Sequence, residues 1–374
     1  MKEEAIKRVL TELKAQNNFR KLTPLNKTLI NLSSNDYIEL GNDENLKKQF
    51  FQKAQLKLSS SSSRLMNGSY DEVIRLEKRL QEIYGKEGVV FNSGFSANSS
   101  IIKTFYNKNS LIITDQFNHA SIYDGIKASG AKFVRYHHLD MNHLEEILKK
   151  NREKYDDIVV ISETIYSMDG TICDLHQLVQ LKKQYHFDLM IDEAHSYGVY
   201  GYGLAHKLNL VDKIDFLIIP LGKGGGSVGA YVITTPLFKD YIINKSYEFI
   251  YSTANPPINN AWNLFLLEKM PTFSEQRKKL QELSKFFLEI LEKHQIHTNS
   301  KSHIISIIIG DNQKATFVAE QLKQNGFQIY AIKEPTVPKN TSRLRISLNS
   351  TLQKEELLHF TQLLSKKLNS KEKK

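Results

Sequence analysis

A lysine and an aspartate each follow a short apolar run, and these two residue types suit cofactor chemistry. Lys223 follows one such run inside a glycine-rich segment, and Asp192 closes another. Ser93-Gly94-Phe95 and His119 likewise follow apolar runs and come just before segments with helical spacing. Each of these residues alone is more typical of a solvated loop or a helix cap than of an active site. Their shared place at the ends of predicted strands, where α/β sheets bind ligands, makes the set informative.

Together these groups match the demands of pyridoxal phosphate (PLP). This cofactor needs a lysine amine for a Schiff base and a carboxylate beside its pyridine nitrogen. It also needs a flat group against the ring and amides for the phosphate. Lys223 supplies the amine, Asp192 the carboxylate and His119 the flat group, while Gly94 and Phe95 offer amides at a helix N-terminus. The sequence therefore predicts a PLP enzyme whose cofactor is held on Lys223.

Two other motifs point to different chemistry, and each lacks a required part. Asp192-Glu193-Ala194-His195 spells a helicase motif, but neither Gly-Lys pair, at 85–86 and 222–223, completes a phosphate loop of the form GxxxxGK[ST]. Gly224–Gly229 matches GxGxxG, but it leads into the strand-like run 230–234 and not into the helix that a dinucleotide fingerprint opens. The chain also lacks HExxH, GxSxG and paired CxxC motifs, so no metal site is predicted.

The composition argues against several other classes of protein. The 374 residues exceed one compact core, 40% are hydrophobic, 25% are charged, and the formal net charge is +10. No apolar run nears the roughly 18 residues of a membrane span, and the N-terminus is unlike a secretory signal. Cys173 is the only cysteine, which excludes an intramolecular disulfide and favours a cytoplasmic protein. The basic residues are scattered, which favours solubility over nucleic-acid binding.

Strand and helix patterns alternate through the first two thirds of the chain. The apolar runs predict seven strands, at 88–91, 111–114, 133–136, 158–161, 187–191, 216–219 and 230–233. Such alternation predicts an α/β fold with a mostly parallel seven-stranded sheet, followed by a small α+β C-terminal domain. We expect an N-terminal segment at 1–37, a large PLP-binding domain at 38–270 and the small domain at 271–374.

Over nearly its whole length the chain resembles the α-oxoamine synthases, PLP-dependent transferases of fold type I. The resemblance rests on seven motifs: 33–37 (SSNDY), 93–98 (SGFSAN), 118–121 (NHAS), 167–170 (SMDG), 192–195 (DEAH), 222–224 (GKG) and 250–253 (IYST). The stretch 331–338 (AIKEPTVP), with 343–345 (RLR) after it, is similar to the family members that use a pimeloyl thioester. These members act in biotin biosynthesis.

The resemblance implies a role for each matching position. Lys223, Asp192 and His119 would be catalytic, with His195 on the phenolic oxygen of the ring. The implied cofactor-binding residues are Lys223, Asp192, His195, His119, Gly94, Phe95, Ser167 and Thr253. The implied substrate-binding residues are Arg20, Asn35, His119, Glu163, Tyr251, Thr336 and Arg345, with the Arg345 guanidinium on the amino-acid carboxylate.

The implied reaction is the decarboxylative condensation of L-alanine with pimeloyl-CoA or a pimeloyl-acyl carrier protein. The resemblance also implies a cytoplasmic homodimer in which Tyr251 and Thr253 reach the neighbouring subunit's site. One alternative is another α-oxoamine synthase, such as glycine C-acetyltransferase. A second is a catalytically silent PLP-fold or nucleic-acid-binding protein, for which the net charge of +10 is the motive.

One departure from the family concerns the phosphate. Three residues before the lysine, relatives often carry a Thr or Ser that contacts the phosphate, and this chain has Pro220. Proline offers neither a hydroxyl nor an amide donor. We expect Ser227 or the neighbouring subunit to replace the lost contact.

Overall fold

The computed structural model describes the chain except for residues 1, 23, 25, 53–56 and 370–374, and it divides into two compact units. The large unit comprises Ile38–Tyr166 and Ile172–Arg277. The small unit comprises Met1–Tyr37, Ser167–Thr171 and Lys278–Lys374, apart from the residues just excluded. Segment Ser167–Thr171 thus groups with the small unit, although the range predicted for the large domain includes it.

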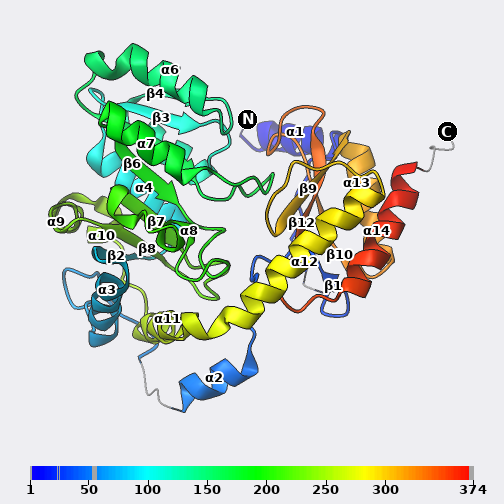
Figure 1. The fold of residues 1–374 in the computed structure, drawn as a ribbon, viewed down its shortest axis with the longest axis horizontal. Helices are drawn as coiled ribbons and strands as arrows, with labels where there is room; N and C mark the ends of the chain where they lie inside the picture. Colours follow the sequence, from blue (N-terminus) through cyan, green and yellow to red (C-terminus); the bar gives the residue numbers. More distant parts are fainter. Residues whose placement is uncertain (1, 23, 25, 53–56, 370–374) are drawn as a thin grey trace. The chain divides into compact units, whose positions relative to one another are not determined.

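A seven-stranded sheet forms the centre of the large unit, as predicted (Figure 1). Its spatial order is β2-β8-β7-β6-β5-β3-β4, and only β8 runs antiparallel to its neighbours. The strands are β2 (Glu87–Phe91), β3 (Leu111–Asp115), β4 (Lys132–Tyr136), β5 (Ile158–Glu163), β6 (Asp188–Asp192), β7 (Phe216–Pro220) and β8 (Ala230–Thr234). All six residues of β5 are buried, as expected for a central parallel strand, whereas four of the five in edge strand β4 are exposed.

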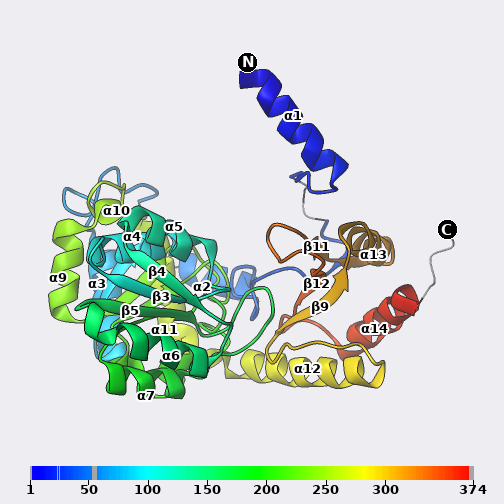
Figure 2. The ribbon, with the colours of Figure 1, turned by 90° about the horizontal axis from the view of Figure 1, so that it is seen from above.

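Helices cover both faces of this sheet. Figure 2 shows α4 (Gly94–Phe105) and α5 (Ala120–Ser129) on one face, with α6 (Met141–Asn151) and α7 (Leu175–Tyr185) on the other. The main hydrophobic core of the large unit lies between the sheet and α4 and α5. There Ile101 of α4 packs with Ile161 of β5 and Ile218 of β7. The remaining helices of the large unit are α2 (Glu44–Phe51), α3 (Asp71–Tyr84), α8 (Leu204–Lys207), α9 (Pro236–Lys245), α10 (Tyr247–Ile250) and α11 (Pro257–Lys269), with short 3-10 turns at Arg152–Lys154, Val211–Lys213 and Met270–Phe273.

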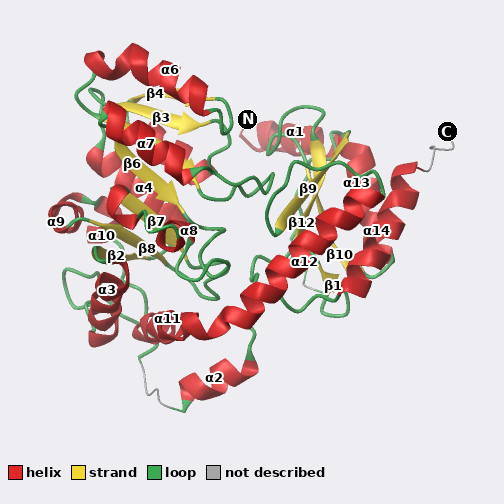
Figure 3. Cartoon of the chain, viewed as in Figure 1, coloured by secondary structure: helices red, strands yellow, loops and turns green. Residues whose placement is uncertain are grey.

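The small unit has the predicted α+β character (Figure 3). Its three-stranded antiparallel sheet has the order β11-β12-β9, and β1 pairs in parallel with β10. The strands are β1 (Ile30–Asn31), β9 (Ile304–Gly310), β10 (Phe327–Gln328), β11 (Tyr330–Ile332) and β12 (Ser342–Ser347). The helices are α1 (Lys2–Ala15), α13 (Asn312–Gln324), α14 (Lys354–Asn369) and most of α12 (Ser274–Lys293). Among the described helices, none is both long and apolar enough to cross a membrane.

Two arginines of β12 hold segment Ser167–Thr171 in the small unit. Arg343 forms an ion pair with Asp169, and the two side chains are 5% and 18% exposed. Nε of Arg345 donates to the Ser167 carbonyl oxygen at 2.5 Å. Gly170 has φ of +66°, and an added Cβ would lie 1.8 Å from the Ile304 carbonyl oxygen, so the segment approaches β9 as closely as only glycine permits.

A buried carboxyl group follows β6 in the large unit. Glu193 is fully buried, and its Oε1 accepts a hydrogen bond from the Ala205 amide at 2.6 Å. An added Cβ at Gly203 would lie 1.5 Å from Oε2, so the backbone closes tightly over the carboxyl group. Burial raises the pKa of Glu193 from 4.5 to about 8, against the opposing effect of the Ala205 amide. The folded protein therefore favours the protonated acid.

Glu193 should make the protein less stable as the pH rises. Because the pKa is higher in the folded state, the stability that protonated Glu193 contributes is complete below pH 4.5 and is lost as the pH rises to about 8. Glu193→Gln keeps the acceptor for the Ala205 amide but does not titrate. We expect urea unfolding to show a wild-type advantage over the variant that shrinks between these two pH values, by about 1.4 kcal/mol per unit of pKa shift. A difference that stays constant with pH would contradict this prediction.

Candidate active site

A cavity of about 350 Å³ opens in the large unit, a volume typical of a small-molecule site. It lies where β2, β3, β5, β6 and β7 end, as expected for an α/β sheet. Its lining residues are Asn92, Ser93, Gly94, Phe95, Asn98, His119, Ser121, Glu163, Asp192, Ala194, Pro220, Gly222, Lys223, Val228 and Gly229. Six of the predicted site residues therefore meet in one cavity: Gly94, Phe95, His119, Glu163, Asp192 and Lys223.

Lys223 lies in the turn that joins β7 to β8. The turn closes on itself because the Leu221 amide donates to the Gly229 carbonyl oxygen at 3.0 Å. Gly229 has φ of +103°, a conformation that strongly favours glycine. This fixed turn directs the half-buried Lys223 side chain into the cavity, where Nζ lies 3.0 Å from Nε2 of His195. His195, which the family resemblance places on the phenolic oxygen of the cofactor ring, thus lies beside the lysine amine.

Asp192 is the last residue of β6 and only 3% exposed. Its Oδ1 accepts a hydrogen bond from the Ala194 amide at 2.8 Å, and Oδ2 accepts one from Nδ2 of Asn98 at 2.6 Å. A buried carboxylate is costly unless such donors satisfy it. The carboxylate is therefore held in one orientation at the cavity wall, where it can pair with a protonated ring nitrogen.

The N-terminus of α4 forms another wall of the cavity. Ser93 caps the helix, because its hydroxyl accepts a hydrogen bond from the Ser96 amide. The first amides of a helix have no partner inside it, so those of Gly94 and Phe95 suit an anion such as phosphate. Pro220 packs directly against this turn: an added Cβ at Gly94 would lie 2.6 Å from Cβ and Cγ of the proline ring. Proline thus fills the position at which the family resemblance predicts a hydroxyl.

His119 caps α5 at the opposite side of the cavity. Its backbone amide donates to Oε1 of Glu163 at 2.6 Å, and its Nδ1 accepts from the Ser121 amide at 3.2 Å. Partial removal from water lowers the pKa of His119, as does the Lys223 charge, whereas Asp192 opposes both. Burial beside Asp192 raises the pKa of Glu163 well above its ordinary value. The cavity therefore favours a neutral imidazole and a protonated Glu163.

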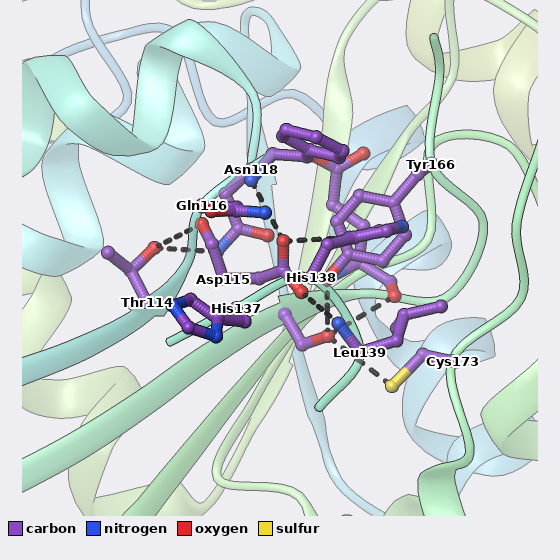
Figure 4. A network of polar contacts seen from close by, with 12 residues as sticks. Thr114, Asp115, Gln116, Asn118, His137, His138, Leu139, Tyr166 and Cys173 are labelled. Atoms are coloured by element: carbon purple, nitrogen blue, oxygen red, sulfur yellow. Dashed lines mark hydrogen bonds and ion pairs between the residues drawn. The ribbon is translucent and has the colours of Figure 1, made fainter. Parts of the chain in front are cut away.

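A second buried aspartate fixes the turn that carries His119 (Figure 4). Asp115, at the end of β3, is fully buried. Its carboxylate accepts hydrogen bonds from the amides of Phe117 at 2.8 Å and Leu139 at 2.9 Å, and it lies 2.9 Å from Nδ1 of His138. These contacts tie the turn after β3 to the loop after β4, so the backbone just before His119 has little freedom.

The other predicted site residues lie outside the lining of this cavity. His195 is fully buried behind it and reaches it through Lys223. Tyr251 and Thr253 belong to the large unit, and their side chains are exposed. The Thr253 carbonyl oxygen accepts a hydrogen bond from Asn92, a lining residue, at 2.7 Å. This exposure is compatible with a role at a subunit interface.

Five predicted residues belong to the small unit: Arg20, Asn35, Ser167, Thr336 and Arg345. Nη2 of Arg345 donates to Oδ1 of Asn35 at 3.1 Å, and Nη2 of Arg20 donates to Oγ1 of Thr336 at 3.3 Å. Four of the residues expected to bind substrate therefore form two hydrogen-bonded pairs within this unit.

Two buried polar residues of the cavity were not singled out from the sequence. Asn98 and Ser121 are 1% and 0% exposed, and both line the cavity. A signal existed in the spacing: Asn98 lies one helical turn after Gly94 on the same face of α4, and Ser121 follows His119 by two residues. Neither signal distinguishes a site residue from an ordinary polar residue before the fold is known.

Ser227, by contrast, does not line the cavity, so the expectation that it replaces the lost phosphate contact is not supported. Its hydroxyl donates to Oδ1 of Asn263 and accepts from Nδ2 of Asn259 at 3.1 Å. Both asparagines lie on α11, which draws the serine away from the cavity.

Taken together, the donors and acceptors of the cavity fit PLP. The amine of Lys223 and the buried Asp192 carboxylate line the same space as the helix N-terminus at Gly94. The close approach of Pro220 to Gly94 leaves a cradle that any Cβ would fill. The Lys223 amine would hold the aldehyde carbon, the Asp192 carboxylate the ring nitrogen, and the amides at Gly94 the phosphate.

Comparison with known proteins gives a consistent result. Residues 27–364 match the family model for aminotransferase class I and II. A protein of Pasteurella multocida, provisionally named 8-amino-7-oxononanoate synthase, is 41% identical over 94% of this chain and 96% of its own length. A protein of Haemophilus influenzae with the same name is 38% identical over 96% of this chain and 100% of its own.

Solved structures of the same fold include two enzymes. The 8-amino-7-oxononanoate synthase of Francisella tularensis superposes with a TM-score of 0.79 at 29% identity, over 92% of this chain and 98% of its own. A serine palmitoyltransferase from S. paucimobilis superposes with a TM-score of 0.87 over 98% and 97% of the two chains. At 24% identity, the second structure supports the fold alone.

The contact between Gly94 and Pro220 should control cofactor affinity. Gly94→Ala places a methyl group into the proline ring, and overpacking of this kind costs about 1–3 kcal/mol. We expect the variant to bind PLP about 5- to 150-fold more weakly in a fluorescence titration. Pro220→Gly removes both ring atoms that the methyl group would meet.

The double variant Gly94→Ala/Pro220→Gly provides the control. Because the two sites share one contact, their effects on affinity should not add, and the double variant should bind PLP more tightly than Gly94→Ala alone. Equal affinity of the two variants would show that the clash is not the cause.

Proposed function

The chain belongs to the aminotransferase class I and II family and, within it, to the 8-amino-7-oxononanoate synthases, and we propose that it condenses L-alanine with a pimeloyl thioester. It is a PLP-dependent acyltransferase-type enzyme of the α-oxoamine synthase group. The names of relatives at about 40% identity support this choice of substrates. The acyl carrier is CoA or an acyl carrier protein, and the net charge of +10 suits either anionic partner.

The proposed reaction balances as follows. The alanine Cα loses its proton and attacks the thioester carbonyl carbon, which expels the thiol. The Cα–carboxylate bond then breaks to release CO₂, and a proton returns to Cα. The products are 8-amino-7-oxononanoate, CO₂ and the free thiol. PLP, when bound, accepts the electron pair that each bond cleavage leaves at Cα.

The cavity residues divide the remaining tasks among them. Lys223 would hold the cofactor and move the proton from and to Cα, because a primary amine on a flexible four-carbon stem can act as both base and acid. Asp192 would pair with the ring nitrogen, and His195, whose Nε2 lies 3.0 Å from the Lys223 amine, would donate to the phenolic oxygen. His119 would stack against the face of the ring. Gly94 and Phe95 bind the phosphate with their amides.

The small unit supplies the proposed substrate contacts. Arg345 binds the alanine carboxylate, and its guanidinium is already oriented by Asn35 and by the Ser167 carbonyl oxygen. Ser167 also contributes to the phenolic edge of the cofactor. Arg20 and Thr336 accompany Asn35 on the thioester side, and Glu163 lies on the substrate side of the cavity.

We further propose a homodimer with shared sites. Thr253 and Tyr251 are exposed next to Asn92, a residue of the cavity lining, and would complete the neighbouring subunit's site. The cytoplasmic location that the single cysteine favours remains a prediction, which fractionation of the native cells would test.

A single arrangement carries the proposal: the Lys223 amine, the buried Asp192 carboxylate and the N-terminus of α4 line one cavity. A catalytically silent or nucleic-acid-binding protein would have no need of this set. The experiment that tests it measures thiol release and product formation with a panel of amino acids and acyl thioesters. L-alanine, glycine and L-serine are each combined with acetyl-, pimeloyl- and palmitoyl-CoA, and with pimeloyl-acyl carrier protein.

We expect activity only with L-alanine and a pimeloyl thioester, and complete loss in Lys223→Ala together with the visible absorption of lysine-bound cofactor. Arg345→Lys should raise KM for alanine more than it lowers kcat, because lysine cannot form the two-pronged contact. Highest activity with glycine and acetyl-CoA would show that these compounds, and not L-alanine and a pimeloyl thioester, are the substrates. Absence of the visible absorption band from the purified protein would refute the PLP role itself.

Mixing two inactive chains should test whether the sites are shared. Lys223→Ala removes the amine, and Thr253→Asp places a negative charge against the phosphate. If Thr253 acts on the neighbouring subunit, a mixed dimer has one site free of both changes. Co-refolded chains should then recover roughly a quarter of wild-type activity, since half of the dimers are mixed. No recovery, despite mixed dimers detected by differential tags, would mean that Thr253 acts within its own chain.

A further inference from the structure

Asn98, in the interior of a helix, donates a side-chain hydrogen bond to the Asp192 carboxylate. It lies on α4, is 1% exposed, and lines the cavity. Its Nδ2 donates to Oδ2 of Asp192 at 2.6 Å and to Oγ of Ser121 at 3.0 Å. The reverse orientation of the amide would place its carbonyl oxygen 2.6 Å from a carboxylate oxygen with no proton between them. Both protons of Nδ2 are therefore committed to these two acceptors.

The carbonyl oxygen of the same amide has no hydrogen-bond partner among the described residues. A buried polar atom without a partner costs stability and calls for a reason. An asparagine selected for packing alone would be replaced here by an apolar residue of similar size. The orphaned oxygen therefore indicates that the two donated hydrogen bonds are what this position provides.

The Ser121 hydroxyl connects Asn98 to the ring of His119 through two hydrogen bonds. Since its Oγ accepts from Asn98, its own proton is directed elsewhere, and Nδ1 of His119 lies 2.8 Å away. The Ser121 amide also donates to Nδ1 at 3.2 Å. Two donors thus converge on one ring nitrogen, so Nδ1 acts as an acceptor. The proton of the neutral imidazole must then reside on Nε2.

We propose that Asn98 and Ser121 are positioning residues of this site, which orient the Asp192 carboxylate and keep the His119 proton on Nε2. The proposal deepens the proposed function, because the two positioned side chains are those that would contact the ring nitrogen and the ring face. A neutral His119 adds no positive charge against a protonated ring. The groups that face it are consistent with this state: Asp192, Lys223 and Glu163, whose Oε1 holds the His119 amide.

The state of His119 can be measured directly. The holoenzyme is labelled with ¹⁵N-histidine, and among its 12 histidines the resonance of His119 is identified by its loss in His119→Asn. At neutral pH and above, we expect the shifts of a neutral ring protonated at Nε2. A proton on Nδ1, or a cationic ring at neutral pH, would overturn the proposal. This readout needs no substrate, so it remains informative if the proposed substrates are wrong.

Two variants separate the role of the Ser121 hydroxyl from the role of the Asn98 amide. Ser121→Ala removes one donor to Nδ1, so the titration midpoint of His119 should rise, while the cofactor absorption spectrum stays as in the wild type. Asn98→Leu removes the donor to Asp192 and the donor to Ser121. It should therefore shift the pH dependence of the cofactor spectrum and lower kcat about 10- to 100-fold. Ser99→Ala is the matched control, since it also removes a side-chain hydrogen bond of α4, to Asp124, but lies outside the cavity lining.

A purely structural role for Asn98 makes a different prediction. It would lower the unfolding temperature of Asn98→Leu without moving the His119 titration or the cofactor spectrum, and that outcome would refute the proposal. If Asn98→Leu does not fold, Ser121→Ala and the wild-type resonance still test it. An unchanged His119 titration in Ser121→Ala would show that its hydroxyl does not set the proton position.

Discussion

The site depends on one costly feature, the burial of the Asp192 carboxylate. At 3% exposure this group has lost nearly all its water, and a carboxylate in such surroundings is tolerated only where donors replace the solvent. One donor, the Ala194 amide, comes from the turn that follows β6. The other comes from Asn98, in the interior of α4. The position of α4 on the sheet is thus an electrostatic requirement as well as a matter of packing.

The parallel sheet explains why the chemical groups converge. Neighbouring parallel strands end at the same edge, so Glu163 at the end of β5 and Asp192 at the end of β6 are paired residues in the sheet register. The turn after β7 brings Lys223 to this edge, and it can do so because β8 returns antiparallel and closes a short loop. The antiparallel strand is therefore the element that keeps the lysine on a short, well-defined tether.

Much of this arrangement could be predicted from the sequence. Buried strands are mostly apolar, so the alternation of strands and helices predicted the sheet. The strand ends predicted five of the six site residues that line the cavity, and the family resemblance added Glu163. Ser227 could not be assigned correctly, because the asparagines that engage it lie more than 30 residues away on α11. Asn98 escaped notice for a related reason. An asparagine inside a helix usually faces solvent, and only the tertiary fold reveals that this one faces a carboxylate.

The residues proposed to bind the cofactor and those proposed to bind substrate are divided largely between the two units. The residues proposed to hold the cofactor lie in the large unit, except for Ser167, whereas Arg345 and Asn35 lie in the small one. The covalent link between the two sets is short: β5 ends at Glu163, and the chain enters segment Ser167–Thr171 four residues later. Arg343 and Arg345 fasten that segment to β12 by an ion pair and a hydrogen bond. The guanidinium proposed to bind the substrate carboxylate is thus anchored to the segment that follows β5 in the sequence, and Glu163 at the end of β5 accepts the His119 amide.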